Sequence, residues 1–446
     1  MSNPFIFGGP VAPNDFFGRS ESVEFIMDRL YGRSRSSVAL WGDRRVGKSS
    51  LLHYLAQPKL RRHWVDNPGR NYMIFIDCQI FAKFNRLVFW QEVLEQISGL
   101  VTDTTMPQEA DALLDGNGIE ERALRRFFRK MQFAGETLTL LLDEFGHLIW
   151  LTSEDARQEL RALFAFLRTT ITAVNPATPN ARPLALVTST RRPLDEVCRP
   201  AYGGSDAGSP FHNPFVFERL KPFQIEDVNT LISSRLVGTD VSFSEQEIKH
   251  LLSMAGCHPI LVQSYASELF TAKEDRGDGL VNFAEIDERF SGRNRQHFHD
   301  FWAYSGRAEQ ELLPEIALGA VDWENLAQGK EHARKQLAER GLITEDLELF
   351  SPAFAEWLRL NLSRLKAAQR AKMGLGETTR LFHSIDSHFN DSELRDLCFE
   401  LGVDYDNLSG DNKRDKAREL VEWMKRYDRL EELTELLTNK RPHLRI

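Results

Sequence analysis

Short apolar runs alternate with amphipathic segments along the first half of the chain. Between the runs, apolar side chains recur at i, i+3, i+4 and i+7 from Leu124 to Met131 and from Leu160 to Leu167, which is typical of helices. Strands that alternate with helices predict an α/β domain with a mainly parallel sheet. The runs predicted to be strands are residues 38–41, 73–76, 138–142, 184–187 and 215–217.

The pattern changes after Pro222, where the chain is helical for about 100 residues. A short helix, a helical run at residues 324–343 and a β-rich pair at 342–344 and 347–350 then predict a winged helix. We expect an α/β core at residues 1–220, a helical lid at 221–300, the winged helix at 301–364, a polar linker at 365–377 and a small helical domain at 378–446.

Apolar stripes at helical spacing predict that the last domain has a core of its own. The stripe residues are Leu394, Leu397, Cys398 and Leu401, then Ala417, Leu420, Val421 and Met424, then Leu430, Leu433 and Leu437.

Composition narrows the class of protein. The chain has 446 residues, of which 42% are hydrophobic, and it contains no apolar run of the roughly 20 residues that a membrane span needs. It begins without the basic and apolar stretches of a signal peptide, and its four cysteines lack metal-ligand spacing. We therefore expect a cytoplasmic protein with reduced thiols. The net charge of −9 argues against general affinity for nucleic acid.

Residues 42–49, Gly-Asp-Arg-Arg-Val-Gly-Lys-Ser, fit the phosphate-loop pattern G-x-x-x-x-G-K-[ST] between a predicted strand and a predicted helix. Glycines allow the tight turn, and the backbone N–H groups and the helix N-terminus attract phosphate. Lys48 is expected to contact the β- and γ-phosphates of ATP or ADP, and the Ser49 hydroxyl to bind Mg²⁺. The other loop residues expected at the nucleotide are Gly42, Arg45, Gly47 and Ser50.

Acidic residues follow the third predicted strand directly, as Asp143 and Glu144. A carboxylate at the end of a buried strand needs a compensating charge, which Mg²⁺ beside Asp143 would supply. Glu144 is placed to orient or deprotonate the attacking water. The fourth strand is expected to lie between the first and the third, so that Ser189, Thr190 or Arg191 faces the γ-phosphate.

These strand ends resemble the nucleotide-binding core of AAA+ and STAND-type ATPases, which include the plant and animal NLR switches. Phe17, Gly18 and Arg19 resemble the entry segment of that family, which packs on adenine. Gly256, His258 and Pro259 resemble the Gly-x-Pro or Gly-His-Pro motif of the family's helical lid, whose proline lies against the base. The resemblance also favours Arg191, in Thr-Ser-Thr-Arg, as the γ-phosphate sensor.

The chain departs from the family in three places. The lid has no Gly-x-x-Arg sensor, the winged helix has no Met-His-Asp motif, and only Arg199 is a candidate for an inter-subunit arginine finger. These departures favour a slow, regulatory ATPase over a ring-forming motor. They are compatible with a homo-oligomer that forms in response to the nucleotide.

The C-terminal segment resembles the death-like, effector-associated domains of bacterial conflict and signalling proteins. The matching positions are Leu397, Cys398, Leu401, Gly402, Val403, Asp404 and Tyr405. The resemblance implies that this domain recruits a protein effector or adaptor, in signalling or antiviral defence. The sequence thus favours a nucleotide-dependent signalling switch with ATP or ADP and Mg²⁺ as cofactors.

A DNA-handling ATPase of the origin-recognition or transposition-helper type is the alternative. Its recognition helix would be residues 330–341, which carry Lys330, Arg334, Lys335 and Arg340 but also Glu331 and Glu339. A phosphate-reading helix would have a more uniformly basic face. A metabolic kinase fits the sequence less well, because we find no group of residues that would bind a second substrate beside the phosphate loop.

Overall fold

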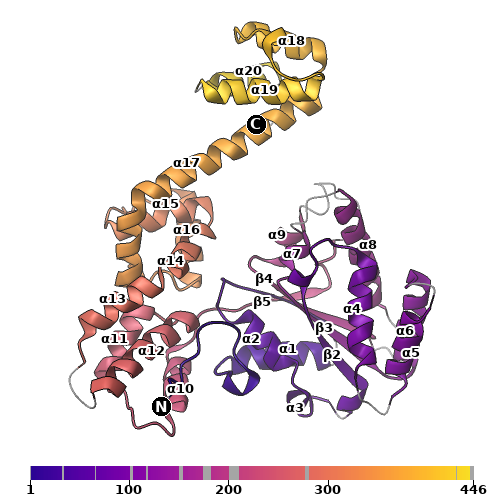
Figure 1. The fold of residues 1–446 in the computed structure, drawn as a ribbon, viewed down its shortest axis with the longest axis vertical. Coiled ribbons are helices and arrows are strands. Elements are labelled where there is room, and N and C mark those ends of the chain that lie inside the picture. The colour runs from indigo at the N-terminus through magenta and orange to yellow at the C-terminus, as the bar shows by residue number, and fades with distance from the viewer. Residues whose placement is uncertain are drawn as a thin grey trace. The chain divides into compact units, whose positions relative to one another are not determined.

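The protein is described by a computed structural model, in which helices surround one parallel sheet and continue beyond it (Figure 1). The residues that it describes are 2–32, 35–65, 67–100, 104–116, 119–149, 154–173, 182–199, 210–276, 281–427 and 429–441. The chain divides into two compact units, Met1–Leu358 and Arg359–Ile446. The finer division predicted from the sequence stays a prediction.

The sheet has five strands in the order β2-β3-β4-β1-β5, and all four pairings are parallel. All five predicted strands are confirmed, and β4 lies between β1 and β3 as expected. Their C-terminal ends therefore share one edge of the sheet. The strands are β1 (Ser37–Trp41), β2 (Asn71–Asp77), β3 (Thr137–Asp143), β4 (Leu184–Thr190) and β5 (Phe215–Arg219).

Helices cover both faces of the sheet because the strand side chains alternate between two hydrophobic cores. Ile74 of β2 and Leu140 of β3 belong to a core shared with α4, α6 and α8, whereas Val38 of β1 and Val187 of β4 belong to a core shared with α1 and α2. Figure 1 shows the two helical layers. The helices of this part are α1 (Ser20–Tyr31), α2 (Lys48–Leu55), α3 (Pro58–Arg61), α4 (Arg86–Ser98), α5 (Met106–Leu114), α6 (Glu121–Phe133), α7 (Gly146–Ile149), α8 (Glu154–Ile171) and α9 (Leu194–Cys198).

The segment predicted as a lid is helical, as expected. Its helices pack around Tyr265, which is fully buried and lies edge-on to Phe290 at 5.2 Å between ring centroids. They are α10 (Ile225–Leu236), α11 (Glu245–Ala255), α12 (Pro259–Arg276), α13 (Phe283–Arg293) and α14 (Arg295–Ala303).

The segment predicted as a winged helix contains α15 (Arg307–Ala317), α16 (Gln328–Glu339) and one antiparallel bridge between Ile343 and Leu349. The helical run predicted from residue 324 begins later, at Gln328. Asp322 explains the delay, because its Oδ1 accepts backbone hydrogen bonds from residues 324 and 325 and so forms a turn before the helix.

Residues 365–377, predicted as a polar linker, lie within one continuous helix, α17 (Pro352–His388). Most of these residues are strong helix formers such as Leu, Lys, Ala, Gln and Arg. Gly374 and Gly376 do not interrupt the helix, because a glycine costs only about 1 kcal/mol in a helix interior.

The second unit has its own hydrophobic core, formed between the end of α17 and helices α18 (Asp391–Glu400), α19 (Lys413–Arg426) and α20 (Leu430–Lys440). The predicted stripes are confirmed: ten of the eleven stripe residues are buried there, and Leu430 is partly buried. Among the described helices, none combines the length and the apolar character needed to cross a membrane.

Candidate nucleotide site

The phosphate loop, residues 42–47, connects β1 to α2 at the C-terminal edge of the sheet. The N–H of Gly42 donates to the carbonyl of Thr190 at 3.2 Å, which ties the loop to β4. A Cβ atom at Gly42 would lie 2.6 Å from the carbonyl oxygen of Leu220, so no larger residue fits there. Gly47 has φ = 106°, which favours glycine, and α2 begins at the next residue.

Lys48 is buried, with 6% of the residue exposed. Its Nζ donates to the carbonyl oxygens of Gly42 and Asp43, at 2.9 Å each. Burial lowers the pKa of Lys48, whereas the carboxylates of Glu144 and Asp43 oppose that shift. A buried ammonium held at the loop by neutral carbonyls is suited to exchange them for phosphate oxygens.

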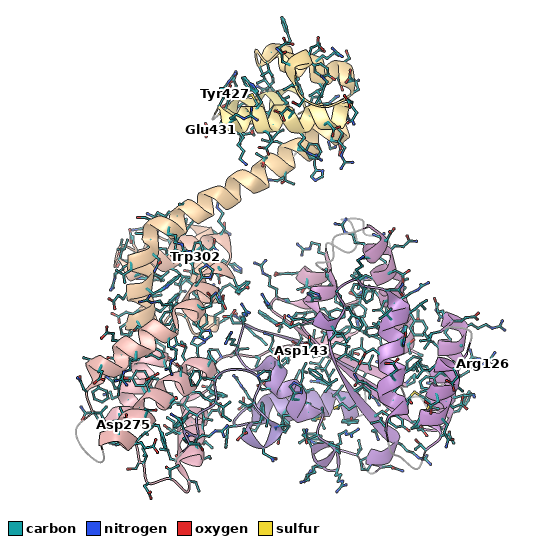
Figure 2. The ribbon with its side chains drawn as sticks, in the orientation of Figure 1. Arg126, Asp143, Asp275, Trp302, Tyr427 and Glu431 are labelled. Carbon is teal, nitrogen blue, oxygen red and sulfur yellow. The ribbon has the colours of Figure 1, made fainter. Side chains whose placement is uncertain are left out.

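The ends of β3 and β4 are connected by a buried hydrogen bond. The Ser189 hydroxyl donates to Oδ1 of Asp143 at 2.6 Å, and the N–H of Phe145 donates to the carbonyl of Ser189 at 2.9 Å. Asp143, labelled in Figure 2, has 5% of its surface exposed. Next to it, a carboxylate oxygen of Glu144 lies 3.6 Å from Nη2 of Arg191. The structure therefore brings both acidic residues to the loop, together with the three candidates at the end of β4: Ser189, Thr190 and Arg191.

A cavity of about 270 Å³ opens beside the phosphate loop. Residues 6–11 line it from the N-terminal segment, and Pro259, Ile260 and Gln263 line it from α12. The predicted site residues that line it are Arg45, Gly47, Lys48, Ser49, Ser50, Glu144 and Pro259. Gly42, Asp143, Ser189 and Arg191 support the loop and the strand ends and are not among its lining residues.

Phe17, Gly18 and Arg19, the predicted entry segment, are not among the residues that line this cavity. Arg19 instead donates from Nη2 to the carbonyl of Val46 at 3.0 Å, and its guanidinium lies 4.6 Å from the ring centroid of Phe223. Burial lowers the pKa of Arg19 to about 10. Arg19 therefore stabilises the phosphate loop through a contact outside the cavity. A direct contact of Phe17, Gly18 or Arg19 with a nucleotide stays a prediction.

The N-terminal residues that do line the cavity were missed by the sequence analysis. The N–H of Ile6 donates to Gln263 of α12 at 2.9 Å, and the N–H of Val11 donates to the hydroxyl of Ser50 at 3.2 Å. The segment therefore spans the cavity from α12 to α2. The apolar, glycine- and proline-containing stretch 5–13 ahead of the first helix was the available signal.

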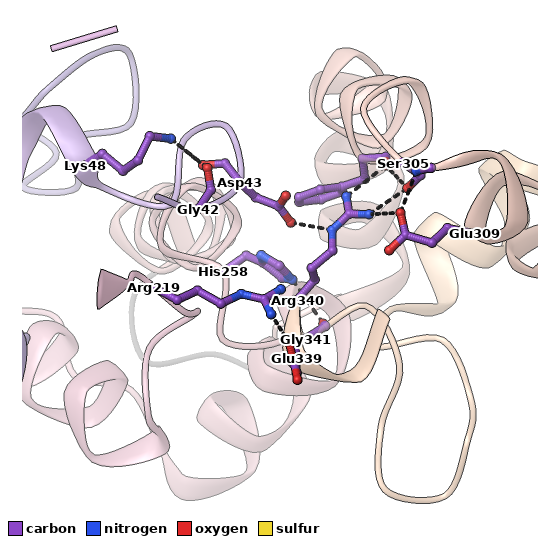
Figure 3. A network of polar contacts seen from close by, with 12 residues as sticks. Gly42, Asp43, Lys48, Arg219, His258, Ser305, Glu309, Glu339, Arg340 and Gly341 are labelled. Atoms are coloured by element: carbon purple, nitrogen blue, oxygen red, sulfur yellow. Dashed lines mark hydrogen bonds and ion pairs between the residues drawn. The ribbon is translucent and has the colours of Figure 1, made fainter. Parts of the chain in front are cut away.

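Two arginines connect the phosphate loop to the helical part of the first unit, and Figure 3 shows one of them, Arg340, beside Asp43. Arg340, which follows α16, donates from Nε to Oδ2 of Asp43 at 2.8 Å. Arg44 of the loop forms an ion pair with Asp300 of α14 at 3.1 Å. The sequence analysis had considered Arg340 only as a candidate DNA contact, since its partner lies 297 positions away.

The chemistry of the donors fits Mg²⁺, because Ser49 offers a hydroxyl and Asp143 a carboxylate near the loop. Mg²⁺ in nucleotide sites typically takes one or two protein oxygens together with phosphate oxygens and water. The described residues contain no cluster of three or more His, Cys, Asp or Glu side chains that would suit another metal.

Comparisons with known proteins agree with this architecture. A search of curated proteins found no match. Among solved structures, a Walker-type ATPase of Pyrococcus abyssi superposes with a TM-score of 0.50 at 18% identity, covering 80% of this chain and 99% of that one. The ORC2 protein of Aeropyrum pernix, described as ADPNP and ADP complexes, superposes with a TM-score of 0.52 at 12% identity, covering 82% and 98%.

A family model covers the C-terminal segment. Residues 381–442 match effector-associated domain 7, and they coincide with the core of the second unit. The resemblance predicted from Leu397 to Tyr405 is thus confirmed for this segment. The chain therefore combines the fold of P-loop ATPases, with a phosphate loop at the edge of a parallel sheet, and a C-terminal segment that matches effector-associated domain 7.

Proposed function

We propose that this protein is a slow, ATP-hydrolysing switch that passes its nucleotide state to a protein effector or adaptor through residues 381–442. One observation carries the proposal. The phosphate loop, the acidic end of β3 and the Ser189–Arg191 end of β4 meet beside a cavity that residues 6–11 and Pro259 also line. The match of the C-terminal segment to an effector-associated domain supports the protein partner.

In this reaction Lys48 would bind the β- and γ-phosphate oxygens, and Ser49 and Asp143 would hold Mg²⁺. The ion would offset charge on the phosphates when bound. Glu144 lies in the cavity lining and would orient or deprotonate the attacking water. Ser189 holds the carboxylate of Asp143 in one orientation, which prepares the metal ligand before the nucleotide arrives.

The surroundings of Arg191 support slow turnover. Its guanidinium is within 3.6 Å of the Glu144 carboxylate and 4.7 Å from the ring centroid of Tyr304. The predicted base and the predicted sensor are thus engaged with each other, and both must turn toward the γ-phosphate before hydrolysis. Tyr304 follows α14, so this step involves the helical part of the unit.

The DNA-handling alternative is weakened by the ion pairs along α16. Lys330 pairs with Glu315 at 2.7 Å, Arg334 pairs with Glu331 at 2.7 Å, and Arg340 is buried. Basic side chains already paired with carboxylates gain less from neutralising DNA phosphates. Filter binding to a duplex at two salt concentrations tests this alternative, which predicts tight and steeply salt-dependent binding.

Calorimetry of the full-length protein with ATP–Mg²⁺ and with ADP tests the proposal directly. Both nucleotides should bind, and phosphate release should be slow. Glu144→Gln should keep the affinity and lower turnover by about 10²–10⁴-fold, since it removes a general base. Glu24→Gln, an exposed acid on α1, is the control and should leave turnover unchanged. Absence of any binding would refute the function, and normal turnover of Glu144→Gln would reassign the base.

A further inference from the structure

Arg340 connects the phosphate loop with helices α14 and α15 through four partners. Besides Asp43, its guanidinium donates to Glu309 at 2.9 Å, to the hydroxyl of Ser305 at 2.8 Å and to the carbonyl of Phe301 at 3.2 Å. Only 7% of the side chain is exposed. Burial lowers the pKa of Arg340, but the two carboxylates outweigh burial and raise it above its ordinary value.

The two carboxylates around Arg340 belong to different parts of the unit. Glu309 is on α15, next to α16, and would stay with Arg340 if the loop moved. Asp43 is a phosphate-loop residue and lies between Gly42 and Arg44, in a loop whose other groups attract anions. Unpaired, its negative charge would repel a polyphosphate. Paired with Arg340, that charge is neutralised.

The position of Arg340 is also fixed by His258, the residue directly before α12. The ring of His258 packs against both Phe301 and Phe350, at 4.8 and 4.7 Å between centroids, and its Nε2 donates to the carbonyl of Gly341 at 3.1 Å. Gly341 follows Arg340, and Pro259, which lines the nucleotide cavity, follows His258. The two residues that follow α16 therefore contact both the loop, at Asp43, and His258 at the start of the helix that borders the cavity (Figure 3).

We propose that Arg340 is a coupling residue, which makes the affinity of the phosphate loop for a nucleotide depend on the position of α16. This inference rests on the proposed function and names the contact through which the switch acts. With α16 in place, Asp43 is neutralised and the loop retains a polyphosphate. When α16 moves away, the bare carboxylate repels the nucleotide. By linkage, a bound nucleotide favours the paired arrangement to the same extent.

The test is the dissociation rate of a fluorescent ADP from the full-length protein, measured in a stopped-flow instrument. Arg340→Met should accelerate dissociation at least 10-fold, because Asp43 loses its counter-charge. Asp43→Asn alone should change the rate less than threefold. The double variant should return to within threefold of the wild type. A merely structural role of Arg340 would leave the double variant fast, and that result would overturn the inference.

Arg340→Met also leaves Glu309 buried and unpaired, so the same four proteins are prepared in a Glu309→Gln background. The rescue by Asp43→Asn is expected there as well, and its absence in both backgrounds would overturn the inference. Failure of the wild type to bind the probe would refute the proposed function itself, a different result from binding without rescue.

The ion pair between Arg219 of β5 and Glu339 of α16 provides a matched control. This ion pair also connects α16 to the sheet, but neither Arg219 nor Glu339 belongs to the phosphate loop. Arg219→Met with Glu339→Gln removes this second ion pair and leaves the pair between Arg340 and Asp43 in place. Because Asp43 stays neutralised, adding Asp43→Asn in this background should change the dissociation rate less than threefold. An equal rescue would show that Asp43→Asn simply stabilises nucleotide binding, and would overturn the coupling role of Arg340.

Discussion

The hydroxyl of Ser189 on β4 donates a 2.6 Å hydrogen bond to Oδ1 of Asp143 at the end of β3. Both residues are buried, so the bond holds the carboxylate with little competition from water. Ser189→Ala should cost about 1.5–3 kcal/mol of unfolding free energy, since a buried carboxylate loses a donor. It should also lower ATP turnover by about 10-fold.

Chemical denaturation and a phosphate-release assay measure these two effects. Nucleotide affinity, measured by calorimetry, should change little, because Ser189 does not line the cavity. Unchanged turnover would contradict a role for Ser189 in orienting Asp143.

Lys48→Ala should weaken the binding of ATP by at least about 10-fold, because a charge-assisted hydrogen bond to phosphate is worth about 1.5–3 kcal/mol. Calorimetry measures the affinity. Lys59→Ala on α3 is the control, because that lysine is exposed and does not line the cavity. Equal affinities of the two variants would contradict the placement of Lys48 at the phosphates.

His258 should make the first unit less stable in mild acid. Burial lowers its pKa from 6.5 to about 4. The unfolded chain takes up the proton near pH 6.5 and the folded chain only near pH 4, so the stabilising contribution is complete above pH 6.5 and is lost as the pH falls through this window. Between pH 7.5 and 5.5 the loss should be about 1 kcal/mol.

Urea unfolding at several pH values checks this prediction against His258→Gln, whose side chain can also donate a hydrogen bond but does not titrate. The pKa of His297 is also lowered to about 4, and because both proteins contain His297, its contribution cancels in the comparison. The wild type should lose more stability than the variant on acidification. Parallel pH profiles would exclude His258 as the source.

Leu397→Ala should destabilise the second unit without weakening nucleotide binding. Leu397 is fully buried in the core of that unit, and such substitutions cost about 2–5 kcal/mol. Thermal unfolding should show a lower midpoint for one transition, and calorimetry should show unchanged affinity for ATP. Phe399→Ala is the control, since 86% of Phe399 is exposed. A matching loss of nucleotide affinity would show that the two units do not fold independently.

The sequence by itself determined the features that depend on short stretches of chain. We could predict the five strands, the phosphate loop with Lys48, and the apolar stripes from Leu394 to Leu437. Their periodicity and motif spacing can each be recognised within a few neighbouring residues. The acidic pair after β3 was predictable for the same reason. Helix propensity also explains why residues 365–377 continue α17, although their polar, glycine-containing composition suggested a linker.

The tertiary structure alone decided which distant side chains meet. Arg340 reaches Asp43 across 297 positions, Arg19 fastens Val46 from behind the loop, and residues 6–11 border the cavity. Contacts of this kind leave no periodic signal, because each partner is an ordinary charged or apolar residue in its own segment. They form only when the helices pack on the sheet and bring distant segments into contact. That packing depends on side chains from the whole unit and not on any one segment.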